Sequence, residues 1–468
     1  MNGLEPIRVA RIRQNGRMDA REVRLAPELA ARLDRRAAAL APLASLSVET
    51  VASSPRELAA LERLTARLAN TYPYGDAHYV GQMLKPPHPV AWAAYAAAML
   101  LNPNNHALDG GPATAEMERE AVAAIAAMFG HAAALGHLTS SGTIANLEAL
   151  WVARELRPQQ AIVYGENAHY THERMCQVLG VAAERLPQDE RGRLELDALA
   201  ARLRAGGVGT VVATLGTTSL GALDPIGEIA DLCAAHGARL HVDAAYGGFY
   251  ALLADGGQPG VEREPFAALA RADSIVVDPH KHGLQPYGCG CVLFADPSVG
   301  RLYAHDSPYT YFTSQELHLG EISLECSRAG AGAAALWTTL EALPLTREGL
   351  GSQLAATREA AEGLVRELDG TAITLVLEPA LDIVCAFPAL ARASQIGARC
   401  EQAFDSLARA GWHAAKLRLR TDWLRRSHPT IEPDAEEVTV LRMVLMKPEH
   451  RAIVPELAAV LREQLARA

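Results

Sequence analysis

Lys281 and Asp243 each follow an apolar, strand-like run of the sequence. Lys281 lies in Val-Val-Asp-Pro-His-Lys-His-Gly (276–283) and Asp243 in His-Val-Asp-Ala-Ala-Tyr-Gly-Gly (241–248). A lysine amine condenses reversibly with an aldehyde to a Schiff base, and a carboxylate that faces a pyridine nitrogen keeps that nitrogen protonated. Taken alone, the lysine is typical of a solvated charge and the aspartate of a turn or helix cap. Together they indicate the chemistry of pyridoxal phosphate (PLP).

A small, hydroxylated segment, Thr-Ser-Ser-Gly-Thr-Ile-Ala-Asn (139–146), follows another strand-like run. Backbone N–H groups at a helix N-terminus, with small hydroxylated residues beside them, bind phosphate well. The candidate phosphate contacts are Ser141, Gly142 and Thr143. The same pattern also fits an ordinary helix N-cap that binds nothing. Its position after a strand, together with the lysine, favours phosphate binding.

The residues around the pair resemble a known family. His-Val-Asp-Ala-Ala-Tyr is followed, 38 positions after its Asp (281 − 243), by the Lys of Asp-Pro-His-Lys. This order resembles the group II PLP-dependent decarboxylases, which include glutamate, tyrosine, aromatic-amino-acid and diaminobutyrate decarboxylases. The resemblance runs from about Asp76 to the C-terminus. It implies a fold-type I enzyme that releases CO₂ and an amine from an L-amino acid through a Schiff base on Lys281, as an obligate homodimer with interfacial sites.

The resemblance also implies roles for residues around the cofactor. His169 matches a histidine that lies flat against the cofactor ring, and Thr217 matches a threonine on the opposite face, although an ordinary strand-end turn would also explain Thr217. Ala245 is small where the ring must lie close to the backbone, and His280 matches a phosphate-binding histidine. Asp278 stands where many family members have Asn. Because a carboxylate would repel a phosphate, we expect Asp278 to point elsewhere.

We expect no bound metal. His172 departs from the family, which has small or hydroxylated residues just after its histidine, and the spacing His169-x-x-His172 is compatible with a metal pair. However, no carboxylate or further histidine is placed to complete that site. Cys289-Gly-Cys291 lacks a second cluster at zinc spacing, so buried strand cysteines explain it better.

The proton that replaces CO₂ on the substrate needs a donor. In the family this is a tyrosine on a loop after the lysine, and here Tyr309 and Tyr311 both fit. The spacing does not choose between them, and either could simply pack the loop. Arg328, in Leu-Glu-Cys-Ser-Arg-Ala-Gly (324–330), resembles a Ser-Arg motif. It is interpreted either as a contact to an anion, such as the substrate, or to a second subunit, or as half of a structural salt bridge.

The substrate is the least determined part. His78 and Gln82 lie in the segment 78–83, which matches the family's entrance segment and makes both residues candidate substrate contacts. Gln82 and Lys85 would suit an acidic or polar substrate, whereas Tyr79 would suit an aromatic one. We favour an aromatic L-amino acid. The alternative function is a PLP-dependent carbon–carbon lyase or a decarboxylating aldehyde synthase on the same fold.

The elements that must position these residues alternate between strand-like and helix-like patterns. Several candidate strands are apolar throughout, as in a mostly parallel, buried sheet. The expected strands of a large α/β domain are 134–138, 161–164, 183–186, 210–215, 239–242, 274–277 and 289–294. The helices expected in and before it are 56–69, 88–102, 113–129, 143–155 and 226–236, the third of them with acids in its first turn.

The sequence pattern changes after about Leu345, where expected helices and strands indicate a small C-terminal α+β domain. Its expected helices are 351–368, 391–410 and a terminal helix to Ala468, and its expected strands are 373–377, 383–387, 414–419 and 438–446. We therefore divide the chain into an N-terminal arm with helices for dimer contact (1–95), a PLP-binding large domain with a seven-stranded sheet (96–345) and the small domain (346–468).

Composition fits a cytoplasmic enzyme. The chain has 468 residues, 49% of them hydrophobic and 21% charged, and a net charge of −10, which argues against a nucleic-acid or anionic-membrane partner. The seven cysteines have no pairing pattern, as expected of reduced thiols. No secretory signal is visible, and the longest apolar helix (90–101) is shorter than the roughly 20 residues that span a bilayer.

Overall fold

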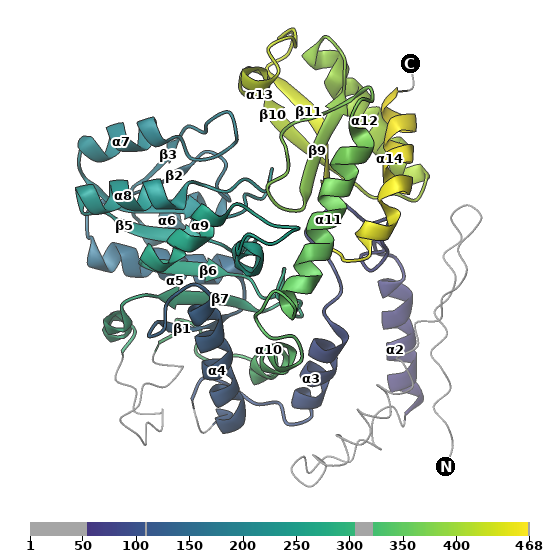
Figure 1. Cartoon of the computed structure of the whole chain (residues 1–468). Helices are drawn as coiled ribbons and strands as arrows, with labels where there is room; N and C mark the ends of the chain where they lie inside the picture. The colour runs from purple at the N-terminus through teal and green to yellow at the C-terminus, as the bar shows by residue number, and fades with distance from the viewer. Residues whose placement is uncertain (1–53, 108–109, 305–321, 467–468) are drawn as a thin grey trace.

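The computed structural model describes residues 54–107, 110–304 and 322–466. This part of the chain contains a seven-stranded sheet in the order β1-β7-β6-β5-β4-β2-β3 and a four-stranded sheet in the order β10-β11-β9-β8 (Figure 1). The strands of the large sheet are β1 Leu135–Thr139, β2 Ala161–Gly165, β3 Ala183–Leu186, β4 Val208–Thr214, β5 Arg239–Asp243, β6 Ser274–Val277 and β7 Gly290–Phe294. All seven expected strands are confirmed, each within two residues of its expected ends.

Strand direction in the large sheet is what brings the candidate residues together. Neighbouring strands are parallel from β3 through β2, β4 and β5 to β6. Strand β7 runs antiparallel to both β6 and β1, because the connection from β6 holds no crossover helix. Strand β1 therefore points the same way as β6. The carboxyl ends of β1, β2, β4, β5 and β6 all meet at one edge of the sheet.

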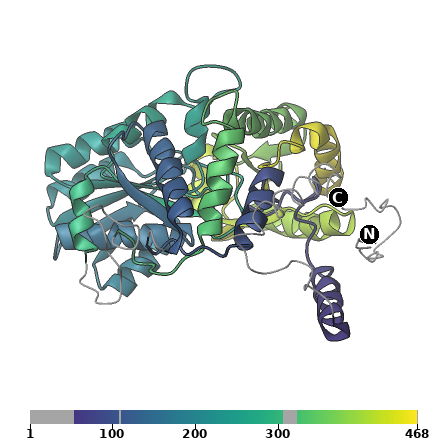
Figure 2. The same cartoon turned by 90° about the horizontal axis from the view of Figure 1, so that it is seen from below.

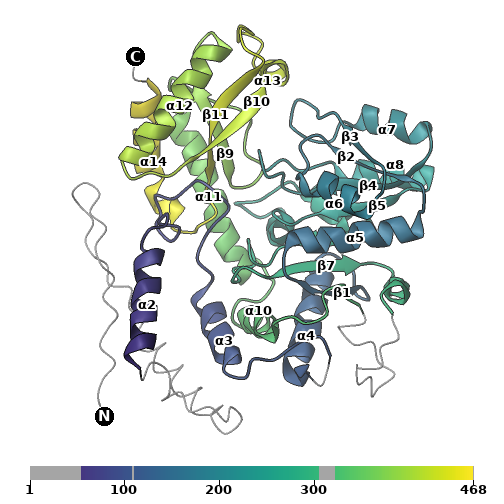
Figure 3. The ribbon, with the colours of Figure 1, turned by 180° about the vertical axis from the view of Figure 1, so that it is seen from behind.

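Helices cover both faces of this sheet. Helices α5 (Gly142–Leu156) and α6 (Thr171–Leu179) lie on one face, and α7 (Leu196–Arg204) and α8 (Ile226–His236) lie on the other (Figures 1 and 3). The strands β2, β4, β6 and β7 are buried along their whole length, as expected of a sheet covered on both faces. The shorter helical elements of this half are η3 Gly248–Leu253, α9 Arg263–Ala267, η4 Ala268–Arg271 and η5 Pro297–Leu302.

Three helices pack beside the β1 edge, namely α3 (Pro89–Met99), α4 (Pro112–Met128) and α10 (Gly330–Ala342) (Figure 3). The expected acids in the first turn of α4 are wrong. This helix begins at Pro112, which suits the first helical position because proline has no N–H to leave unpaired, and its first turn contains no acid. Glu116 and Glu118 consequently lie one turn further along the helix.

The small sheet is antiparallel and carries its own helices. Its strands are β8 Ile373–Leu375, β9 Ile383–Pro388, β10 Ala415–Arg420 and β11 Glu437–Val444, and its helices are α11 Leu350–Leu368, α12 Ala393–Arg409, α13 Thr421–Ser427 and α14 His450–Ala466. Only α13 had not been expected. Val242 of β5 and Val384 of β9 belong to one continuous hydrophobic core, so the two sheets are packed together rather than joined by a bare linker.

Helix α2 (Pro55–Leu68) stands apart from the rest of the described chain (Figures 1 and 2). None of its residues is buried. Four of its leucines (Leu58, Leu61, Leu64 and Leu68) are between 49% and 61% exposed. None of the described helices combines the length and the apolar character that crossing a bilayer requires.

Candidate active site

The ends of five strands place the residues singled out by the sequence along one edge of the large sheet. Ser141 follows β1, His169 follows β2, Thr217 follows β4, Asp243 ends β5 and Lys281 follows β6. In open α/β sheets, ligands bind at the carboxyl ends of the strands. The topology therefore brings these residues to the place where a ligand is expected.

Lys281 presents its amine close to a carboxylate. Its Nζ lies 3.0 Å from Oδ2 of Asp278, and the same oxygen is 3.6 Å from Nε2 of His280. The Lys281 side chain is 19% exposed, whereas that of Asp278 is 4% exposed. The expectation that Asp278 points away from the site is therefore wrong. The lysine amine beside this carboxylate offsets part of the cost of burying it.

Gly142 lies against this carboxylate. A Cβ atom at Gly142 would be 2.5 Å from Oδ2 of Asp278, so no larger residue fits there. Ser141 caps α5, because its Oγ accepts the N–H of Ile144 at 3.3 Å. The free N–H groups of the first turn of α5 are the kind of donors that bind a phosphate. The Asp278 carboxylate lies at the same helix end, so its negative charge opposes the binding of a phosphate there.

Asp243 is held by two donors. Its Oδ2 is 2.9 Å from Nε2 of His172, and its Oδ1 accepts the N–H of Ala245 at 3.1 Å. Burial alone would raise the pKa of Asp243, but the hydrogen bond and charge of His172 and the charge of Lys281 outweigh burial and lower this pKa. Asp243 is thus a charged carboxylate although it is only 5% exposed.

The two candidate cofactor histidines have defined proton positions. The N–H of Thr171 donates to Nδ1 of His169 at 3.2 Å, so the ring proton of His169 is on Nε2. In His280 the roles are reversed, because Nδ1 lies 2.7 Å from the carbonyl oxygen of Cys289 and must donate to it. Burial lowers the pKa of both histidines and favours their neutral forms. Nε2 of His280 is left to face the site.

Thr217 is fixed within its own turn. Its Oγ1 accepts the N–H of Ala222 at 3.0 Å and lies 3.5 Å from Nδ2 of Asn167. The side chain is buried. These contacts are those of an ordinary strand-end turn, which was the alternative explanation of Thr217. The contact of Thr217 with the cofactor remains a prediction.

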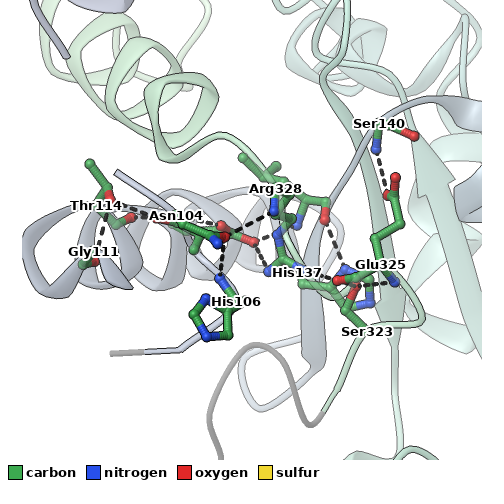
Figure 4. Close-up of polar contacts among 12 residues, drawn as sticks. Asn104, His106, Gly111, Thr114, His137, Ser140, Ser323, Glu325 and Arg328 are labelled. Carbon is green, nitrogen blue, oxygen red and sulfur yellow. Dashed lines mark hydrogen bonds and ion pairs between the residues drawn. The ribbon is translucent and has the colours of Figure 1, made fainter. Parts of the chain in front are cut away.

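Arg328 is engaged in an ion pair. Its Nη2 lies 2.8 Å from Oε1 of Glu118, which also accepts the N–H of Leu138. These contacts join the segment before α10 to β1, which supports the structural salt bridge among the alternatives for Arg328. Nearby, Glu325 accepts the backbone N–H of Ser140 at 2.7 Å and so holds the start of the phosphate-binding candidate segment (Figure 4).

The candidate substrate residues His78 and Gln82 lie in the segment between α2 and α3. Nδ1 of His78 is 2.8 Å from Oδ1 of Asp76, and its ring packs edge-on against Trp412 at 4.3 Å. Gln82 is exposed. These positions leave the substrate contacts of His78 and Gln82 as predictions. The two candidate proton donors, Tyr309 and Tyr311, lie outside the described residues.

The donor set suits PLP. Lys281 is accessible, Asp243 is charged and buried, and a glycine opens a helix at a point where a side chain would not fit. A family model described as the pyridoxal-dependent decarboxylase conserved domain matches residues 89–387. The chain belongs to the pyridoxal-dependent decarboxylase family.

Named relatives agree with this assignment. The chain is 31% identical to a probable L-tyrosine/L-aspartate decarboxylase of Methanothermobacter thermautotrophicus, over 66% of this chain and 83% of the relative. It is 34% identical to a probable L-aspartate decarboxylase of Halobacterium salinarum, over 66% and 82% of the two chains. It is 29% identical to the L-tyrosine decarboxylase of Enterococcus faecium, over 68% of each chain. The chain is accordingly a PLP-dependent amino-acid decarboxylase, a carboxy-lyase.

Solved structures show the same fold. Mouse CSAD superposes with a TM-score of 0.75 at 22% identity, covering 94% of this chain and 98% of that one. The TDC of Oryza sativa, solved with PLP and tryptamine, superposes with a TM-score of 0.76 at 18% identity, covering 97% and 100%. The fold-type I architecture of this decarboxylase is thereby confirmed.

One residue near the site of this decarboxylase was missed by the sequence reasoning. Arg442 of β11 is buried, and its guanidinium donates to the carbonyl oxygens of Ser219 (3.1 Å), Thr218 (2.5 Å) and Gly81 (3.4 Å). It therefore links the turn that carries Thr217 to the entrance segment. Its signal in the sequence is a lone cation in an otherwise apolar strand, Val-Leu-Arg-Met-Val.

Proposed function

We propose that this decarboxylase acts on an L-amino acid with an aromatic side chain, and that L-tyrosine is the first substrate to test. The main support for this proposal is the position of Tyr287. Its hydroxyl donates to the carbonyl oxygen of Met83 at 2.9 Å, and its ring lies 4.8 Å from that of His280. An aromatic surface thus joins the entrance segment to the turn that holds Lys281. The names of the relatives from Methanothermobacter and Enterococcus, which both include L-tyrosine, support the same choice.

A second aromatic group supports the entrance. The ring of Tyr79 packs edge-on against Tyr74 at 5.1 Å, and Tyr72 lies 6.3 Å from Tyr79. L-Aspartate is the competing substrate, since relatives are named for it and Arg442 supplies a buried cation that donates to backbone carbonyl oxygens. Either substrate has an α-carboxylate, and we assign Arg442 to hold a substrate carboxylate.

The residues of the site divide the work of holding the cofactor. Lys281 would bind the cofactor aldehyde, Asp243 would face the ring nitrogen and His169 would lie against the ring. The first turn of α5, with Gly142, would hold the phosphate, and His280 would join it, as the resemblance implies, by donating from Nε2 when the ring carries a second proton. When bound, PLP supplies an electron sink for the bond that breaks at the substrate Cα.

The residues of the chain decide which bond breaks and where the proton goes. A carboxylate held perpendicular to the ring is lost most easily, so its orientation by Arg442 and the entrance segment favours loss of CO₂ over other outcomes. A proton must then be added to Cα. We assign this step to Tyr309 or Tyr311, as the resemblance implies, and a phenol is suited to it because its proton is present at neutral pH.

The test is release of labelled CO₂ from the common L-amino acids by purified enzyme supplied with PLP. L-Tyrosine is expected to give the highest kcat/KM and an amine as the product. A preference for L-aspartate would reject the aromatic assignment, and an aldehyde with ammonia or peroxide would favour the aldehyde synthase instead. The variant Tyr287→Ala should lower kcat/KM for L-tyrosine more than for L-aspartate, with Tyr287→Phe as the matched control that keeps the ring.

We also propose a homodimer that uses α2. The leucines of α2 recur at helical spacing and form one apolar face that no described residue buries. The variant Leu61→Glu with Leu64→Glu should dissociate the dimer, as measured by sedimentation, while Arg63→Glu on the opposite face should not. An unchanged dimer in the double variant would contradict this assignment.

Two further assignments stay predictions with partial support. A cytoplasmic location agrees with seven cysteines that form no disulfide. The proposed division of the chain is 1–95, 96–345 and 346–468; the separate large and small sheets support its second boundary, whereas its first boundary falls inside α3. Limited proteolysis, with cleavage near residue 345 before any cleavage inside a sheet, would support the boundary between the last two parts.

A further inference from the structure

His172 lies directly behind Asp243. It is fully buried in the first turn of α6, and its Nε2 is 2.9 Å from Oδ2 of Asp243. The other carboxylate oxygen accepts the N–H of Ala245. Each oxygen of Asp243 therefore has its own donor, which fixes the plane of the carboxylate relative to the site.

A single turn of backbone connects His169 and His172. The N–H of His172 donates to the carbonyl oxygen of His169 at 3.1 Å, and the N–H of Thr171 donates to Nδ1 of His169. Tyr164 of β2 lies beside His172, with ring centroids 6.1 Å apart. His169 is partly exposed, whereas His172 is buried against the carboxylate of Asp243.

The proton between His172 and Asp243 lies on the histidine. A carboxylate with a lowered pKa has no proton to give, so Nε2–H of His172 is the donor. Among the described residues, Nδ1 of His172 has no hydrogen-bond partner.

Other titratable groups also face Asp243, from the loop before α6, from β5 and from the turn after β6. Together with His172 they are His169, His241 and Lys281. His241 is occupied by Ser274 Oγ and Asn146 Oδ1, each at 2.9 Å, and burial lowers its pKa to about 3, so it remains neutral. Both ring nitrogens of His241 are thus engaged by residues other than Asp243. His172 is the histidine that hydrogen-bonds to Asp243.

We propose that His172 is a positioning residue: its hydrogen bond keeps Asp243 charged and aimed at the ring nitrogen of the cofactor, so that this nitrogen keeps its proton. The inference rests on the proposed placement of the cofactor ring against Asp243. Without the donor, a buried carboxylate takes the proton from the nitrogen, because the charged form loses its compensation. The ratio of protonated to unprotonated ring nitrogen should then fall on the order of 10- to 100-fold, as expected for loss of a hydrogen bond to a charged group.

The test is the ¹⁵N chemical shift of enzyme reconstituted with PLP that is labelled at the ring nitrogen. Wild-type enzyme and His172→Gln, whose amide can donate to Asp243, should both give the shift of a protonated nitrogen. His172→Phe, which keeps an aromatic ring but has no donor, should move toward the unprotonated shift and lose kcat with little change in KM. Tyr164→Phe changes a residue that lies beside His172 but does not contact the carboxylate, so this variant should behave like wild type.

The outcomes separate this inference from the proposed function. A wild-type enzyme that retains no PLP would reject the proposed function itself. A protonated nitrogen in His172→Phe, or its loss in both His172→Phe and His172→Gln, would overturn the role of His172 alone. If His172→Phe does not fold, the wild-type proton spectrum decides, because the Nε2–H proton should give a downfield, exchange-protected signal that disappears in His172→Gln. Absence of that signal would also overturn the proposal.

Discussion

Replacing Asp243 by asparagine removes one negative charge at nearly constant volume. Asparagine has a single acceptor oxygen, whereas Asp243 accepts from both His172 and Ala245. One of these two donors therefore meets an amide N–H₂ group and stays unpaired, which costs about 1–3 kcal/mol of stability. The variant should fold with a lowered melting temperature, and Lys281 should still bind the cofactor.

The effect on catalysis should be larger than the effect on stability. A preorganised group that stabilises charge in the transition state is typically worth about 3–4 kcal/mol, or on the order of 10²- to 10³-fold in kcat. Asp243 is buried and charged, so its charge acts with little screening. We expect Asp243→Asn to lose at least that factor in kcat with cofactor still bound, measured as CO₂ release per bound PLP.

Asp224 provides a matched control for this variant. It is also a buried aspartate, and it accepts two backbone N–H groups, from Thr214 at 2.7 Å and from Leu194 at 2.8 Å. Asp224→Asn imposes the same loss of one acceptor and one charge away from Lys281, so its kcat should stay near that of wild type. The reasoning is refuted if Asp243→Asn retains a kcat within a few-fold of wild type, or if both variants lose kcat equally.

Three further predictions follow from neighbouring groups. Asp278→Asn removes a negative charge beside Gly142, so the dissociation constant for PLP should fall by about tenfold; weaker binding in a cofactor titration would count against phosphate at this helix end. Arg442→Gln should lower kcat/KM by roughly 10- to 100-fold, mainly through KM, if Arg442 holds a substrate carboxylate; an unchanged KM for every amino acid would reject that role. Burial raises the pKa of Asp224 to about 6, so its contribution to stability is present at low pH and is lost as the pH rises through about 6. Denaturant unfolding should show this loss as about 3 kcal/mol in wild type and as a flatter profile in Asp224→Asn.

Much of the fold was predictable because strong local patterns decide it. The strands of the large sheet are apolar runs bounded by polar turns, and such runs can only be satisfied inside a covered sheet. Lys281 and Asp243 were predictable for a related reason. Asp243 ends one strand of a parallel pair and Lys281 follows the other, and the carboxyl ends of parallel strands share one edge.

The parts that the sequence did not predict depend on contacts between distant segments. The His172–Asp243 hydrogen bond joins residues 71 positions apart, and the Arg442 contacts join β11 to residues more than 200 positions away. The orientation of Asp278 is a second case. Repulsion from a phosphate predicted that it points away, whereas attraction to Lys281 in the next turn holds it in the site.

The covalent attachment of PLP to Lys281 is the central claim, and peptide mass spectrometry after borohydride reduction tests it most directly. The account predicts one pyridoxyl group per chain, on the peptide that contains Lys281, and none in Lys281→Ala. An unmodified Lys281 peptide from enzyme that decarboxylates an amino acid, or a pyridoxyl group on another lysine, would contradict it.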